Sequence, residues 1–133
     1  MRSIIIDAGP LIALFLKRDT HHRQAVEWAK RTSARLITTW PVVCEACFFF
    51  GPSGKHALFT FIQRGAVEVS GVEVADLLRL GELLAKYPDM DFADGTSIML
   101  AEKTGTTDIA TIDNRDSSAY RTRDGRAFRN VFC

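Results

Sequence analysis

Residues 4–10 read Ile-Ile-Ile-Asp-Ala-Gly-Pro, and this stretch decides the fold that the sequence predicts. Three consecutive β-branched apolar residues are typical of a strand that is buried on both faces of a parallel sheet. Asp7 follows at the C-terminal end of that strand, where open α/β sheets place their ligand crevice. Pro10 suits the first position of a helix, so the stretch predicts a strand, a carboxylate at its end and then a helix.

The rest of the chain alternates between strand-like and helix-like segments. Strands are expected at residues 36–39, 67–69 and 109–112, with a short edge strand near residues 128–132. Helices are expected at about residues 10–17, 20–29, 41–50, 53–62, 72–86 and 91–104. Such alternation predicts an α/β fold, a three-layer sandwich around a central, mainly parallel sheet.

Residue types at the helix ends set the expected boundaries. Thr20 and Ser53 are candidate N-caps, and Pro41 suits a first helical position. Asp91 is the expected N-cap of the helix at residues 91–104, and Gly105 is expected just past its C-terminus.

Composition bounds the class of protein. With 133 residues, 47% of them apolar, we expect one domain over residues 1–133 with its own core. The formal net charge of +1 predicts no global basic field, so a nucleic-acid site must depend on local charge. Three cysteines make a poor disulfide framework, and no apolar run resembles a signal peptide or a membrane span. We therefore expect a cytoplasmic protein with no membrane partner.

Asp7 and Asp113 occupy equivalent positions. Each follows an apolar strand, and each has a structural explanation as a polar residue where a strand enters a turn. The functional explanation is that two such strand ends, adjacent in a parallel sheet, bring two aspartates within reach of one ion.

Glu45 is the only charged residue from Val42 to Phe50. A helix that is apolar on all sides is expected to be largely buried, where an unpaired carboxylate costs several kcal/mol. A basic side chain would compensate that charge structurally and a divalent cation would do so functionally. The other carboxylates favour the cation.

Asp94 lies three residues after Asp91. If Asp91 is the N-cap, Asp94 sits where a carboxylate binds free backbone amides and favours the helix dipole. Asp94 also shares its helical face with Ile98 and Ala101, which points it inward. We therefore assign Asp91 as the cap, in support of the site, and Asp94 as the ligand.

A carboxylate cluster of this kind suits one chemistry. Mg²⁺ and Mn²⁺ prefer oxygen ligands, and they stabilise carboxylates that are too close together to ionise without repulsion. Such an ion polarises a phosphodiester and activates water. Phosphodiester hydrolysis is the predicted reaction class.

Four segments resemble motifs of the PIN domain family, and more narrowly of its VapC-like toxin ribonucleases. They are IIDAGPLIAL at residues 5–14, TTWPVVCEA at 38–46, MDFADG at 90–95 and IATID at 109–113. The resemblance implies a PIN-like fold and a Mg²⁺- or Mn²⁺-dependent endoribonuclease. It also implies a homodimer, an RNA substrate and a cognate antitoxin that covers the active site.

The resemblance assigns roles to particular residues. Its catalytic and metal-binding quartet corresponds to Asp7, Glu45, Asp94 and Asp113. Thr111 and Asp116 correspond to supporting residues, although Asp116 is also explained as a solvated loop aspartate. Gly95 stands where the family more often has alanine, which removes no ligand.

The C-terminal tail offers a candidate RNA-binding surface. Its arginines are Arg115, Arg121, Arg123, Arg126 and Arg129. Arginine suits phosphate through its bidentate fork. An ordinary solvated tail explains them equally well, because acidic residues dilute the charge.

Phe48, Phe49 and Phe50 cannot all face one core. At least one of them is therefore a candidate for a dimer or antitoxin groove, and Phe59 and Phe61 are similar candidates.

A second function of a different class remains open. A catalytically silent PIN-like module could bind RNA or a partner protein without cleaving anything. The presence of all four carboxylates argues against this alternative, because a binding module needs no such cluster.

Overall fold

The computed structural model describes residues 2–113 and 118–133. Its strands are β1 (Ser3–Ile6), β2 (Arg35–Thr39), β3 (Val67–Ser70), β4 (Asp108–Ala110) and β5 (Arg129–Asn130). They form one sheet in the order β3-β2-β1-β4-β5, and every neighbouring pair is parallel. The predicted α/β class and the edge strand near residues 128–132 are confirmed.

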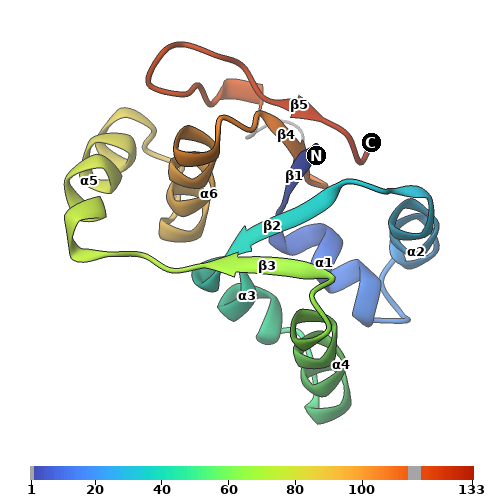
Figure 1. Ribbon diagram of the computed structural model, residues 1–133. Helices are drawn as coiled ribbons and strands as arrows, with labels where there is room; N and C mark the ends of the chain where they lie inside the picture. The colour runs from blue at the N-terminus through green and yellow to red at the C-terminus, as the bar shows by residue number, and fades with distance from the viewer. Residues whose placement is uncertain (1, 114–117) are drawn as a thin grey trace.

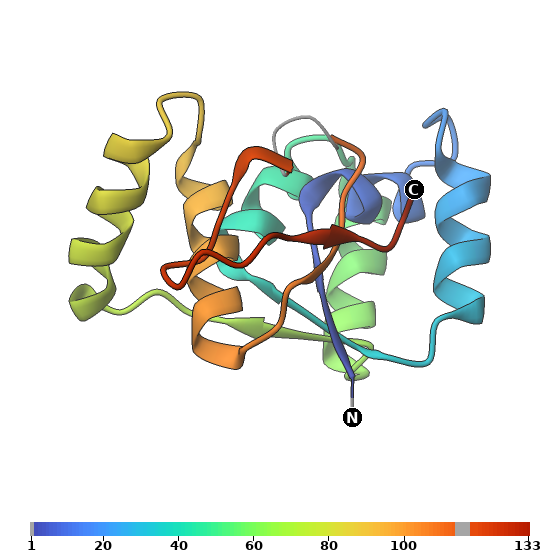
Figure 2. The ribbon, with the colours of Figure 1, turned by 90° about the horizontal axis from the view of Figure 1, so that it is seen from above.

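Helices lie on both faces of this sheet. They are α1 (Ala8–Phe15), α2 (His22–Arg31), α3 (Trp40–Cys47), α4 (Pro52–Gln63), α5 (Leu77–Lys86) and α6 (Phe92–Thr104), with a 3-10 helix η1 (Val74–Asp76) before α5. Helices α5 and α6 lie on one side, opposite α1, α2 and α4 (Figure 1). Seen from above, α5 and α6 stand together at one end of the molecule and α2 at the other (Figure 2). The expected three layers are present.

The isoleucines of β1 serve both faces of the sheet. Ile4 and Ile6 pack in the core formed with α1 to α4, whereas Ile5 packs with Leu100 and Ala101 of α6. Successive side chains of a strand point to opposite faces, so a run without polar residues is needed where both faces are covered. Within the described residues, no helix combines the length and the apolar character needed to cross a membrane.

Helix α1 begins two residues earlier than Pro10 predicted. Asp7 is its N-cap, because Asp7 Oδ1 accepts a hydrogen bond from Ala8 N at 2.9 Å. The prediction of Thr20 as the next N-cap was also wrong, since α2 begins after His21. Asp19 Oδ1 instead accepts the amide of His21 at 2.8 Å in the preceding turn.

Helices α3 and α4 differ from the prediction at their shared connection. Helix α3 ends at Cys47 rather than Phe50, because the amides of the following residues bind carbonyls three positions back, as Phe49 N does to Ala46 O at 3.1 Å. Helix α4 takes Gly51 as N-cap and begins at Pro52, so Ser53 is not the cap. Pro41 was expected as the first residue of this helix. Trp40 precedes it in α3, so Pro41 is the second helical residue.

The remaining boundaries follow local hydrogen bonds. The expected helix at residues 72–86 begins as η1, where Asp76 Oδ2 accepts the amide of Glu73 at 2.8 Å. Asp91 caps α6 and Gly105 ends it with φ of 73°, as predicted. Strand β4 stops at Ala110, because the Asn130 side chain binds both backbone groups of Thr111.

Candidate active site

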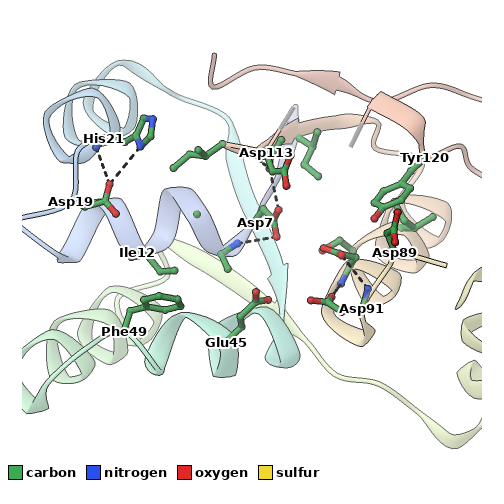
Figure 3. A pocket seen from close by; sticks show the side chains of 18 of the residues that line it. Asp7, Ile12, Asp19, His21, Glu45, Phe49, Asp89, Asp91, Asp113 and Tyr120 are labelled. Atoms are coloured by element: carbon green, nitrogen blue, oxygen red, sulfur yellow. Dashed lines mark hydrogen bonds and ion pairs between the residues drawn. The ribbon is translucent and has the colours of Figure 1, made fainter. Parts of the chain in front are cut away.

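A cavity of about 490 Å³ opens beyond the C-terminal ends of β1 and β4. These strands are neighbours, with Ile6 paired to Ala110, so Asp7 and Asp113 follow adjacent strand ends. The predicted quartet of Asp7, Glu45, Asp94 and Asp113 lines this one cavity. Figure 3 shows Asp7, Glu45 and Asp113 approaching the cavity from different elements. The fold therefore gathers four carboxylates that are up to 106 residues apart in the chain.

The two oxygens of Asp7 have different partners. Oδ1 caps α1 through the amide of Ala8, and Oδ2 accepts a hydrogen bond from Thr111 Oγ1 at 3.1 Å. Burial raises the pKa of Asp7, and this outweighs the two hydrogen bonds that lower it. The turn explanation thus holds for Asp7, and the same side chain also lines the cavity.

Thr111 connects Asp7 to Asp113. Its buried hydroxyl donates to Asp7 and accepts a hydrogen bond from Asp113 N at 3.2 Å. A side chain that holds two carboxylate-bearing residues in place fits the supporting role that the family resemblance gave to Thr111.

Glu45 lies in a helix that is not buried on all sides, which corrects the prediction. Trp40 is 51% exposed, and Cys44 is also exposed. Burial is still the largest cause that raises the pKa of Glu45, followed by the charges of Asp91 and Asp7. Within residues 2–113 and 118–133, no basic side chain forms an ion pair with Glu45, so the structural compensation considered above is not found there.

Asp91 and Asp94 bind each other's backbone at the start of α6. Asp91 Oδ1 accepts the amide of Asp94 at 2.8 Å, and Asp94 Oδ2 accepts the amide of Asp91 at 3.2 Å. Burial, with the charges of Asp91 and Asp7, raises the pKa of Asp94 to about 7. Both carboxylates line the cavity. Asp94 therefore takes part in the capping box and also lies in the space where a metal ligand was predicted.

The cavity is acidic as a whole. Seven carboxylates line it, namely Asp7, Asp19, Glu45, Asp89, Asp91, Asp94 and Asp113. His21 also lines it, and no Lys or Arg of the described chain does. Among these described residues, no three His, Cys, Asp or Glu side chains are already arranged to hold a metal ion. Asp7 and Asp94 instead accept backbone amides.

Three of these lining residues have no local sequence pattern that points to the cavity. Asp19 and His21 come from the turn between α1 and α2, and Asp89 comes from the turn before α6. Asp19 and Asp89 follow no apolar strand, so the signal that identified Asp7 and Asp113 does not exist for them. Only the packing of these turns around the sheet edge brings them to the cavity.

The described arginines of the tail do not line the cavity. Arg121 Nη1 donates to the carbonyls of Ser118 and Tyr120 at 2.7 and 2.8 Å. Arg123 pairs with Glu82 at 3.2 Å, and its amide donates to Glu102 at 2.7 Å. Arg126 pairs with Asp124 and Arg129 with Asp108. Arg115 and Asp116 lie outside the described residues, so their predicted roles stay predictions.

Comparisons with known proteins agree with this architecture. The family model of the PIN domain matches residues 4–123. Ribonuclease VapC26 of Mycobacterium tuberculosis (strain ATCC 25618 / H37Rv) is 27% identical over 131 residues, which cover 94% of this chain and 97% of that protein. The crystal structure of M. tuberculosis VapC20, a sarcin-ricin loop cleaving toxin, is similar with a TM-score of 0.78 at 21% identity. That similarity covers 87% of this chain and 94% of VapC20 and shows a shared fold.

Proposed function

This chain belongs to the PIN domain family, and we propose that it is a divalent-metal-dependent endoribonuclease. One observation carries the proposal. Carboxylates from four separate segments, Asp7, Glu45, Asp94 and Asp113, line one cavity at the carboxyl edge of a parallel sheet. A structural role for each one separately does not explain why all four face the same space.

The donor set fits Mg²⁺ or Mn²⁺. Both ions take oxygen ligands, and seven carboxylates line the cavity. The raised pKa values of Asp7, Glu45 and Asp94 have burial as their first cause and neighbouring carboxylates as a further cause. A divalent cation removes that repulsion, and the described part of the lining contains no Lys or Arg to do so. Asp7, Glu45, Asp94 and Asp113 are the residues proposed to hold the ion.

The ion, when bound, supplies polarisation of the phosphodiester and activation of water. The chain's own groups position the reaction. Thr111 holds Asp7 through its hydroxyl and Asp113 through its backbone amide. The capping box of Asp91 and Asp94 orients the Asp94 carboxylate. These contacts limit the freedom of the ligands before any substrate arrives.

We further propose that the protein is the toxin of a toxin–antitoxin pair. The name of VapC26 as a ribonuclease and the description of VapC20 as a toxin support this proposal. A cognate antitoxin would cover the cavity, and a cytoplasmic location follows because RNA is the substrate. The whole of residues 1–133 would act as one nuclease domain, since the family model spans residues 4–123.

A homodimer is part of the same proposal. Large apolar side chains are exposed on η1 and α5, where Val74 is 86%, Leu77 52% and Leu78 80% exposed. Exposed apolar side chains that form one patch are typical of protein interaction sites. Light scattering at several protein concentrations measures the oligomeric state.

The deciding experiment measures cleavage of labelled single-stranded and structured RNAs with Mg²⁺, Mn²⁺ or EDTA. Wild-type protein is expected to cleave only with metal. Asp7→Asn and Glu45→Gln are expected to reduce the rate by more than about 100-fold, because even residues that only support metal ligands cost 10- to 100-fold. Glu27→Gln, on the exposed face of α2, is the matched control and should cleave like wild type.

Two outcomes contradict the proposal. Equal cleavage by wild type and Asp7→Asn would exclude the quartet as the active site. Binding of RNA without cleavage under any metal condition would favour the catalytically silent module instead.

A further inference from the structure

The cavity continues past the quartet to a second group of residues that the reaction does not use. Phe49, Asp19 and His21 line it together with Ile12 of α1. Figure 3 shows these side chains on the side of Asp7 away from Asp91. We propose that this end of the cavity is a subsite for one nucleobase of the RNA, a base that carries an exocyclic amine. The inference rests on the proposed ribonuclease function.

Phe49 provides the flat face of this subsite. It lies in the turn between α3 and α4, where its amide is fixed to Ala46 O at 3.1 Å. Phe49 is 54% exposed although it lines the cavity, so its ring is accessible. Proteins that bind single-stranded RNA stack bases on accessible aromatic rings, because every base has a π face.

Asp19 provides the polar edge. Its Oδ1 accepts the amide of His21 at 2.8 Å, and the His21 ring Nδ1 lies 3.6 Å from the same oxygen. Within residues 2–113 and 118–133, no donor occupies Asp19 Oδ2. An ionised carboxylate only accepts hydrogen bonds, so its partner must be a donor. Cytosine, adenine and guanine present an exocyclic amine to such an acceptor, whereas uracil offers a single N3–H donor flanked by two carbonyl oxygens that a carboxylate repels.

Charge decides which part of the RNA enters this end of the cavity. Seven carboxylates line the whole cavity, so the end of the cavity that lies beyond the quartet would repel a second phosphate of the RNA. A base is neutral, flat and partly apolar, which suits Phe49 and Ile12. When the scissile phosphate of an RNA lies at the quartet, the neighbouring base of that RNA lies within the same continuous cavity. This continuity favours RNA over a peptide as the occupant.

The experiment compares Phe49→Leu with Phe48→Leu. Phe48 is 86% exposed in the same turn but does not line the cavity, so it is a matched control. Single-stranded RNA oligonucleotides with each of the four bases at every position near the cleavage point are the probes, with Mg²⁺. Phe49→Leu is expected to raise KM roughly tenfold with little change in kcat, since stacking contributes to binding. Phe48→Leu should leave both unchanged.

Asp19→Asn tests the edge. Asparagine keeps an oxygen that can accept the His21 amide and adds an amine donor, so the turn is preserved while the acceptor-only edge is lost. Wild type is expected to prefer amine-bearing bases over uracil at one position by roughly tenfold, and Asp19→Asn should remove that preference. Thermal unfolding of each variant checks that the fold is retained.

Failure of the subsite and failure of the ribonuclease proposal give different results. If wild type cleaves with metal and Asp7→Asn does not, yet Phe49→Leu matches Phe48→Leu in KM, the nucleobase subsite is wrong. If Phe49→Leu weakens only inhibition by a co-purified antitoxin and leaves RNA cleavage unchanged, the same surface binds protein and the subsite is again wrong. Absence of cleavage by wild type would overturn the ribonuclease function and, with it, this inference.

Discussion

Asp7 illustrates how one carboxylate meets a structural and a chemical demand at once. Oδ1 caps α1 and Oδ2 accepts from Thr111, while the charge of the group faces the cavity. Burial raises the pKa of Asp7, although the hydrogen bonds from Ala8 and Thr111 lower it. The folded protein therefore keeps this carboxylate where its charge is costly without a cation, as sites that bind ligands commonly do.

Asp94→Asn tests the same cost of a buried charge at a second carboxylate of the cavity. The pKa of Asp94 is raised to about 7, so its ionisation costs stability in the metal-free protein, and this cost grows as pH rises from about 4 to about 7. We expect Asp94→Asn to stabilise the metal-free protein by about 1 kcal/mol at pH 8, a Tm gain of roughly 3 °C, because water screens part of the full shift. Differential scanning calorimetry in EDTA measures the change.

The same variant supplies its own control at lower pH. At about pH 3.5, below the ordinary aspartate pKa of 3.8, the Asp94 carboxyl is mostly protonated in both the folded and the unfolded protein, so the substitution should give little gain there. An equal gain at both values would mean that the effect comes from packing or capping rather than from charge.

Helix α6 has clear capping residues at both ends and lies beside the quartet. Asp91 caps its first turn and Gly105 ends it in the left-handed conformation that favours glycine. Its C-terminal half packs against Ile5 and Ile109 of the sheet through Leu100 and Ala101. A helix that is held at both ends and along its core face can hold Asp94 in a defined place.

Asp91→Ala measures the contribution of the N-cap. Loss of the acceptor for Asp94 N is expected to lower the free energy of unfolding by about 1 kcal/mol, within a range of roughly 0.5–2. Asp91→Asn keeps a side-chain oxygen and should lose much less. Urea unfolding of the metal-free proteins gives both values, and equal stability of the alanine and asparagine variants would contradict the capping role.

The acidic cavity sets the pH dependence of the whole molecule. Asp7, Glu45 and Asp94 have raised pKa values, so the folded state binds more protons than the unfolded state between about pH 4 and pH 7. Their contribution to stability therefore falls as pH rises through that window. Glu102 and Asp108 have lowered pKa values because arginine side chains bind them. The stability that these ion pairs contribute is therefore lost only as pH falls below about 4.

We expect the metal-free protein to be more stable at about pH 5.5 than at about pH 8, by roughly 1–2 kcal/mol. Excess Mg²⁺ should raise Tm more at pH 8 than at pH 5.5, because the ionised carboxylates bind the cation and binding to the folded state stabilises it. Thermal melts with Mg²⁺ or EDTA at both values provide the measurement. A larger Mg²⁺ effect at the lower pH would contradict the carboxylate site.

Local patterns accounted for much of the fold. Ile4 to Ile6 predicted a strand covered on both faces, and Asp91 and Gly105 predicted the ends of α6. Predictions failed where a neighbouring group changed the hydrogen bonding. Asp7 starts α1 before Pro10. The turn after Cys47 ends α3 before Phe50, and the Asn130 side chain ends β4 before Thr111.

By itself, the sequence determined the α/β class, the sheet with its parallel strands and the identity of the four carboxylates. Apolar periodicity and helix caps act over a few residues, so they can be recognised without a structure. Only the tertiary structure decided that Asp19 and Phe49 share the cavity with the quartet, that the described arginines pair away from it, and that the pKa of Asp94 is about 7. Burial and electrostatic interactions act through space between distant segments, and no local pattern encodes those distances.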